Sequence, residues 1–175
     1  MSSPTVRPAS EADIAAIKCI ADGCKREVGF ISRGMLRNAS GRGELLVATL
    51  GSEVVGFVDF HRRRDGQITI YGIVVAAEQR GHGIGRSLVA ALVAEPLPAR
   101  LALKCPTDNA ANNFYAMLGF QCVGVEAPTR RRPLNLWVLE GTQLSALITF
   151  VPPLAHPALP KSSAALPAAS RSVRC

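Results

Sequence analysis

The pattern of hydrophobic and polar residues along the chain predicts alternating strands and helices over its first 140 residues. Several short segments carry the alternating, β-branched and aromatic residues of strands. Others repeat hydrophobic residues at the three-to-four-residue spacing of a helix. The expected strands are Thr5–Arg7, Leu45–Leu50, Val54–Phe60, Gln67–Val75, Arg100–Cys105, Gln121–Val125 and Leu134–Leu139. The expected helices are Ser10–Gly23, opened by a capping box, a weakly indicated Ile31–Arg37, Ile84 to about Glu95, and Asp108–Leu118.

Helices that interrupt a mostly antiparallel run of strands favour a single covered sheet. We therefore expect an α+β (mixed α/β) fold, with a central, mostly antiparallel sheet of about six to seven strands and helices on both faces. The length of 175 residues suggests one domain, which we place at residues 1–140. Residues 141–175 form a Pro/Ala/Ser-rich tail. From residue 152 onward 15 of its 24 residues are Pro, Ala or Ser, and we expect the tail to be largely disordered because it buries little apolar surface.

A loop with three glycines at alternate positions, Gly81, Gly83 and Gly85, links the strand that ends at Val74-Val75 to the helix that begins at Ile84. Glycines allow backbone N–H groups to approach a ligand closely. The positive end of the following helix points to the same place, which favours a phosphate. The loop differs from a P-loop, which needs Gly-Lys-Ser/Thr, and from the Gly-x-Gly-x-x-Gly dinucleotide pattern. Taken alone, a strand-to-helix turn without a ligand stays the alternative.

Charge and cysteine content narrow the class of protein. The net charge is +7, with dense clusters at Arg62–Arg64 and Arg130–Arg132. We favour solvated loop tips for both clusters, with a surface for a polyanion or acidic substrate as the alternative. The five cysteines lack metal-ligand spacing, so we expect reduced thiols and no metal. With no apolar run of about 20 residues and no apolar signal segment, we expect a cytoplasmic protein without membrane contact.

A second motif, Asp108 to Tyr115 followed by Gly119-Phe120, completes a family resemblance. Together with Arg80-Gly81-His82-Gly83-Ile84-Gly85, the chain resembles the GNAT superfamily of acyl-CoA-dependent N-acetyltransferases. The family reads Gln/Arg-x-x-Gly-x-Gly/Ala in the loop and Asn-x-x-Ala-x-x-Phe-Tyr in the later helix. The order of elements over residues 5–139 is also similar. The resemblance implies transfer of an acetyl group from acetyl-CoA to a primary amine of a small molecule or protein.

The resemblance also implies roles for individual residues. The strand end at Val74 and Val75 would lie beside the pantetheine arm, with an N–H group polarising the thioester carbonyl. Tyr115 aligns with the tyrosine that protonates the leaving thiolate, and its ordinary pKa near ~10 keeps it protonated. The remaining cofactor contacts are predicted at Arg80, Gly81, His82, Gly83, Ile84, Gly85, Arg86 and Asn112.

The base that takes the amine proton is left open among Glu78, Asp59, His61, Tyr71 and a water molecule. Two positions depart from the family. Leu103 stands where the ribosomal-protein acetyltransferases of this family carry an acidic residue, which argues against the same substrate. Asp108 replaces the usual asparagine, so Asn109 or Asn112 is the alternative amide contact to the cofactor.

Two other functions stay open at this point. One is a non-catalytic acyl-CoA-binding or regulatory module, against which Tyr115 argues. The other is a toxin-like acetyltransferase that acts on aminoacyl-tRNA, which the arginine clusters suggest weakly. We otherwise expect no nucleic-acid partner, and the resemblance leaves a monomer or a homodimer open.

Overall fold

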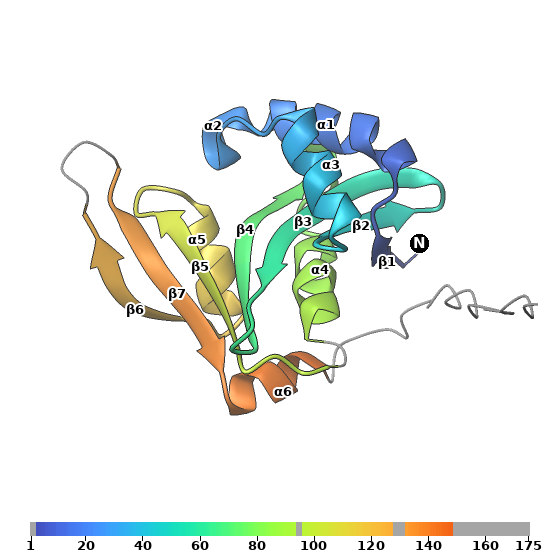
Figure 1. Ribbon diagram of the computed structural model, residues 1–175. Helices are drawn as coiled ribbons and strands as arrows, with labels where there is room; N and C mark the ends of the chain where they lie inside the picture. Colours follow the sequence, from blue (N-terminus) through green and yellow to red (C-terminus); the bar gives the residue numbers. More distant parts are fainter. Residues whose placement is uncertain (1–2, 94–95, 128–131, 149–175) are drawn as a thin grey trace, which may run out of the picture.

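A computed structural model describes residues 3–93, 96–127 and 132–148 (Figure 1). Its centre is a seven-stranded sheet in the order β1-β2-β3-β4-β5-β7-β6. The strands are β1 (Thr5–Pro8), β2 (Leu45–Leu50), β3 (Glu53–Arg62), β4 (Gln67–Val75), β5 (Arg100–Pro106), β6 (Gln121–Glu126) and β7 (Leu134–Glu140). The helices are α1 (Ile14–Gly23), α2 (Lys25–Val28), α3 (Arg33–Gly41), α4 (Ile84–Leu92), α5 (Ala111–Met117) and α6 (Thr142–Ile148), with 3-10 turns η1 (Glu11–Asp13) and η2 (Ala77–Gln79). The predicted mixed fold is confirmed.

Strands β4 and β5 are the parallel pair in an otherwise antiparallel sheet. Their pairing runs from Gln67 opposite Arg100 to Ile70 opposite Leu103 and stops there. The rest of β4 stays paired with β3, and the rest of β5 with β7. The sheet therefore opens between the last residues of β4 and β5, and the two halves diverge in Figure 1.

A β-bulge lies in β4 at the start of this divergence. Asp59 of β3 is opposite Gly72, but the next residue, Phe60, is opposite Ile70. Tyr71 is thus the extra residue of the bulge, and it is 65% exposed. A bulge bends the strand and redirects its side chains, so β4 presents different residues to each face on either side of Tyr71.

Two hydrophobic clusters hold helices to opposite faces of the sheet (Figure 1). Leu88 of α4 and Tyr115 of α5 belong to one cluster, together with Phe60 from the sheet. Ile17 of α1 and Leu36 of α3 belong to the other. Apolar side chains at helical spacing thus face the sheet from both sides, as the hydrophobic pattern predicts.

Several boundaries differ from the sequence prediction. Helix α3 continues to Gly41, past the predicted end at Arg37, because Leu36 and Ala39 pack into the core. Helix α5 begins at Ala111 rather than Asp108. Packed structure continues past residue 140: Leu144 and Leu147 of α6 are buried. The remainder of the predicted tail, residues 149–175, lies outside the described residues, as do Arg130 and Arg131 of one arginine cluster.

Across residues 3–93, 96–127 and 132–148, no helix has the length and hydropathy needed to cross a membrane.

Candidate active site

A cavity of about 590 Å³ lies where β4 and β5 separate. The end of β4, the glycine loop with the start of α4, and helix α5 with the turn before it form its walls. Most of the predicted site residues line it together: Val74, Val75, Arg80, Gly81, Gly83, Ile84, Gly85, Arg86 and Tyr115. His82 and Asn112 are not among its lining residues.

The glycine loop has the backbone conformation that the spacing of its glycines requires. Gly81 and Gly83 have φ values of 82° and 78°, a region that other residues rarely adopt. Gly83 is the N-cap of α4, and its carbonyl accepts the Ser87 N–H at 3.0 Å. The amides of Ile84 and Gly85 come before Ser87, whose amide donates to the Gly83 carbonyl, and helix N-terminal amides at these positions have no acceptor within the helix. Both residues line the cavity, and the N-terminus of a helix favours an anion.

Arg80 ties this loop to α2. Its guanidinium donates to both carboxylate oxygens of Glu27, at 3.0 and 3.3 Å, and to the Val75 carbonyl at 3.2 Å. The hydrogen bond from Arg80 to Glu27 raises the pKa of the guanidinium. The Arg80 amide donates to the Ala77 carbonyl at 3.3 Å. Both polar groups of Arg80 thus have protein acceptors, which assigns it to holding the loop in place.

Tyr115 is 7% exposed, and its ring lies among aromatic neighbours. Its centroid is 5.4 Å from Phe114, 5.8 Å from Phe120 and 6.3 Å from Trp137. Burial, with a smaller contribution from the Cys105 thiol, raises the pKa of Tyr115 well above its ordinary value. Among the described residues its hydroxyl has no hydrogen-bond partner, and Tyr115 lines the cavity. It is therefore a protonated donor beside the space for a ligand.

Asn112 has a different place from the predicted cofactor contact. Its amide nitrogen donates to the carbonyls of Pro106 at 2.8 Å and Asn109 at 2.7 Å. Its oxygen accepts hydrogen bonds from Asn135 at 3.0 Å and from the Trp137 indole at 2.9 Å. Both ends of the amide are used within the protein, so the prediction for Asn112 is not supported. Asn109, the neighbouring alternative, lines the cavity.

The four side chains left open as the base lie on η2, β3 and β4. Glu78 is exposed on η2 and is absent from the cavity lining. Asp59 is half-buried on β3, and burial raises the pKa of its carboxyl to about 6, against the opposing charge of Arg42. His61 and Tyr71 line a second hollow of the same sheet. None of these four side chains is in the wall of the first cavity.

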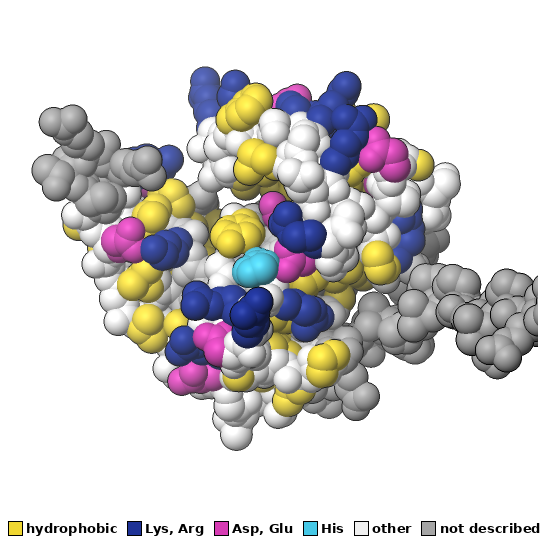
Figure 2. Space-filling view, in the orientation of Figure 1, with side chains coloured by type: hydrophobic (Ala, Val, Ile, Leu, Met, Phe, Trp, Pro, Cys, Tyr) yellow, Lys and Arg dark blue, Asp and Glu magenta, His cyan; other side chains and the backbone are white. Residues whose placement is uncertain are grey.

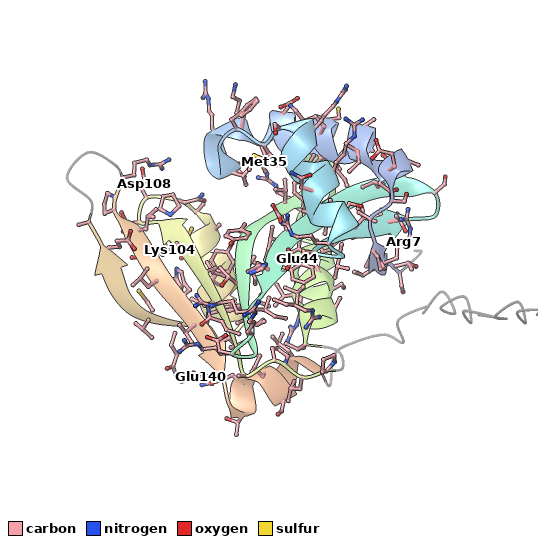
Figure 3. All side chains as sticks on the ribbon, viewed as in Figure 1. Arg7, Met35, Glu44, Lys104, Asp108 and Glu140 are labelled. Atoms are coloured by element: carbon pink, nitrogen blue, oxygen red, sulfur yellow. The ribbon has the colours of Figure 1, made fainter. Side chains whose placement is uncertain are left out.

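The sequence reasoning missed the contribution of α2 and of the β6–β7 connection. Arg26 and Glu27 of α2 line the cavity, as does Arg132, which pairs with Asp108. Figure 3 shows Asp108 at the end of β5 nearest this connection. Contacts such as that between Glu27 and Arg80 join residues 53 positions apart, and no local pattern marks such a pair. Among the described residues, no cluster of three or more potential metal ligands is present.

The fold is shared with solved structures of acetyltransferases. A family model described as an acetyltransferase (GNAT) domain matches residues 41–122, the stretch that contains β2 to β5, the glycine loop and α5. Residues 41–122 are therefore similar to the GNAT acetyltransferase domain. The match covers the motif residues on which the resemblance depended.

Solved structures with the same fold include Ard1 from Thermoplasma volcanium, with a TM-score of 0.69 and 21% identity over 78% of this chain and 96% of that one. The ribosomal-protein-S18-alanine N-acetyltransferase from Escherichia coli has a TM-score of 0.65 and 23% identity, over 78% and 93%. The yncA protein of Salmonella typhimurium, solved with its cofactor acetyl-CoA, has a TM-score of 0.64 and 21% identity, over 79% and 94%. No curated protein matches the chain by sequence.

Proposed function

We propose that the protein transfers an acetyl group from acetyl-CoA to a primary amine, by direct attack of the amine on the thioester. The observation that carries the proposal is the cavity between β4 and β5, which combines a glycine-lined helix N-terminus with a buried tyrosine. The helix N-terminus suits a diphosphate, and the tyrosine suits a leaving thiolate that needs a proton. The yncA structure contains acetyl-CoA, which supports the same cosubstrate here.

The separation of β4 from β5 supports binding of a pantetheine arm. Beyond Ile70, the edge of β4 that faces β5 has no strand partner among the described residues. An extended ligand can lie along such an edge and use its N–H and C=O groups. An amide near Val74 or Val75 would then polarise the thioester carbonyl. Phe114 and Ile73 supply the apolar part of the wall.

The chain's own groups account for the proton balance. An ammonium has no lone pair, so the acceptor must first lose a proton to a base or to water before it attacks the carbonyl carbon. As the new C–N bond forms and the C–S bond breaks, the sulfur takes up a proton. Tyr115, kept protonated by burial, is placed to donate it. The tyrosine regains a proton from the nitrogen, which has one more to lose.

The test is release of CoA thiol from acetyl-CoA with a panel of amino acids, small amines and peptide N-termini. Acetyl-CoA binding is measured separately by calorimetry. Turnover that falls by about 100-fold in Tyr115→Phe, with binding retained, supports the proposal. Tight binding with no turnover on any amine would instead indicate a non-catalytic acyl-CoA-binding module. Absence of both would remove the proposed function.

A further inference from the structure

A carboxylate and a histidine, Glu44 and His61, form a close pair on the sheet face that carries α1 and α3. His61 Nδ1 lies 2.6 Å from Glu44 Oε1. The same oxygen accepts the Arg62 amide at 3.1 Å, and the other carboxylate oxygen accepts Arg42 Nε at 2.5 Å. Glu44 is 7% exposed. The carboxylate is therefore held in place from three sides.

The pair has a defined proton arrangement. Burial acts to raise the pKa of Glu44, but hydrogen bonds from Arg42, the Arg62 amide and His61 outweigh burial and lower that pKa below its ordinary value. An ionised carboxylate only accepts hydrogen bonds. The His61 Nδ1 must then carry a proton, and in the neutral ring the lone pair is on Nε2. A carboxylate that orients a histidine in this way is the arrangement of a general base.

His61 lies at a hollow of about 570 Å³, lined by His61, Arg63, Arg64, Asp65, Thr69 and Tyr71. The side chain of His61 is 45% exposed. Tyr71, the bulge residue of β4, is two positions from Ile73, which lines the first cavity. At about 3.3 Å per strand residue, these two lining residues are about 7 Å apart along β4. Figure 3 shows Glu44 near the centre of the view, beside β2 and β3.

The charge around the hollow is mostly positive. Arg63 and Arg64 line it, and the opposing charge comes from Asp65, whose carboxylate lies 3.7 Å from Arg63 Nε. Figure 2 shows Lys and Arg side chains gathered on this face around a histidine. Arg42 is paired to Glu44. A purely cationic acceptor is repelled by such a site, whereas an acceptor with a carboxylate gains a partner for arginine.

We propose that this hollow is the acceptor site, that it takes an amine which also carries a carboxylate group, and that His61, oriented by Glu44, removes the proton from that amine. The inference rests on the proposed function. It fixes the base that sequence reasoning left open, and it names the substrate class.

The step balances. The ammonium gives one proton to His61 Nε2, and the free amine forms the C–N bond at the thioester carbonyl as the C–S bond breaks. The nitrogen loses a second proton as it becomes an amide, and the departing sulfur gains one. One proton is released overall, and His61 returns to its neutral form by giving its proton to solvent.

The first experiment tests the base in the full chain. In His61→Gln we expect kcat with a carboxylate-bearing acceptor to fall by about 100-fold, with the KM for acetyl-CoA unchanged. Activity should recover with added imidazole and at alkaline pH, where more of the amine is already free. Glu44→Gln should also lower kcat, and added imidazole should not restore the activity of this variant. Thermal unfolding of each variant checks that it folds.

The pH profile must be read against every charged group around His61. These groups are Glu44 and Arg42 before β2, Asp59 and the arginines of β3 and its turn, Asp65, and Tyr71 of β4. Asp59→Asn is the competing variant. If it removes the acidic limb of the profile and His61→Gln does not, the base is Asp59 and the inference is overturned.

The second experiment tests the substrate class with matched probes. Free amino acids are compared with their carboxamides, which keep the amine and lose the carboxylate. We expect kcat/KM to be at least about 10-fold higher for the acids, because their carboxylate makes one charge-assisted contact that the carboxamide cannot make. Arg64→Gln should reduce this preference, and Arg37→Gln, a surface arginine outside both cavities that pairs with Glu11, should leave it unchanged.

The outcomes separate the two proposals. Equal or better use of carboxamides or polyamines overturns the inference and leaves the acetyltransferase in place. Binding of acetyl-CoA with no turnover of any acid also overturns it. Loss of both binding and turnover overturns the proposed function itself.

Discussion

Gly85 of α4 lies directly against the ring of Phe114 of α5. A Cβ atom at position 85 would be 3.0 Å from Cζ of that ring. Both residues line the candidate cofactor cavity. The third glycine of the loop is therefore required by packing between two helices, whereas Gly81 and Gly83 are required by their positive φ.

Gly85→Ala should weaken acetyl-CoA binding with little change in stability. Alanine favours a helix over glycine by about 1 kcal/mol, and the crowding against Phe114 costs about 1–3 kcal/mol. The ring can relieve the contact by moving into the cavity, so we expect about a 10-fold rise in Kd for acetyl-CoA, measured by calorimetry. Gly34→Ala in α3 is the matched control, because its nearest neighbour would be 3.8 Å away. An unchanged Kd in Gly85→Ala would contradict the assignment.

The loop and the helix that follows it were predictable because their signals are local. Gly81 and Gly83 mark a turn by their conformational freedom, and the spacing of Ile84 and Leu88 marks the helix. The β4 strand, Gln67–Val75, was predicted with the bounds that the structure has. The alternation of side chains along one strand is sufficient to predict where that strand begins and ends.

The parts that sequence reasoning missed depend on contacts between distant segments. The pairing of Glu44 with His61 joins residues 17 positions apart across β2 and β3, and the bulge at Tyr71 sets which residues of β4 face each side. Asn112 has the residue type of a ligand contact, but its neighbours in space use its whole amide. Residue type alone does not distinguish these two uses.

Tyr115→Phe tests the acid. Because burial raises the pKa of this phenol above its ordinary value of about 10, Tyr115 stays protonated across the neutral and mildly alkaline range. The native enzyme should therefore show no loss of kcat from this group up to about pH 10. We expect kcat of Tyr115→Phe to fall by about 100-fold at all these pH values. A native kcat that falls with an apparent pKa below 9 to 10 and becomes flat in Tyr115→Phe would mean that the phenol titrates normally.

Asn112→Ala should destabilise the wall of the cavity that α5 forms. The variant loses the donors to Pro106 and Asn109 and leaves the Trp137 indole, 8% exposed, without its acceptor. We expect a loss of about 2–3 kcal/mol in the free energy of unfolding, measured with denaturant. Asn113→Ala, one position along the helix at an exposed site, is the control and should change it by less than about 0.5 kcal/mol. Equal losses of stability in the two variants would rule out a stabilising role for the hydrogen bonds of Asn112.

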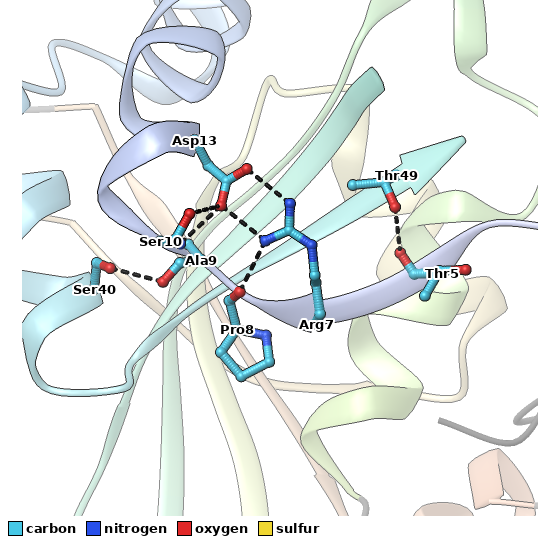
Figure 4. A network of polar contacts seen from close by, with 8 residues as sticks. All are labelled: Thr5, Arg7, Pro8, Ala9, Ser10, Asp13, Ser40 and Thr49. Carbon is cyan, nitrogen blue, oxygen red and sulfur yellow. Dashed lines mark hydrogen bonds and ion pairs between the residues drawn. The ribbon is translucent and has the colours of Figure 1, made fainter. Parts of the chain in front are cut away.

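The ion pair of Arg7 and Asp13 should make stability depend on acid pH. Arg7 Nη1 and Nη2 each lie 2.8 Å from an oxygen of Asp13, and the Ser10 amide donates to the same carboxylate at 2.7 Å (Figure 4). The hydrogen bonds from Arg7 and then from Ser10 lower the pKa of Asp13, against the effect of burial.

Because the pKa of Asp13 is lower in the folded than in the unfolded protein, its stabilising contribution is present above the unfolded value of about 4 and is lost as pH falls toward the folded value. Asp13→Asn should lower the free energy of unfolding by about 2 kcal/mol at pH 7 and flatten its decline in acid. Asp22→Asn, which removes an exposed pair with Lys18, should do neither. The measurement is urea unfolding at a series of pH values, and an acid decline as steep in Asp13→Asn as in the native protein would assign the pH dependence to other carboxylates.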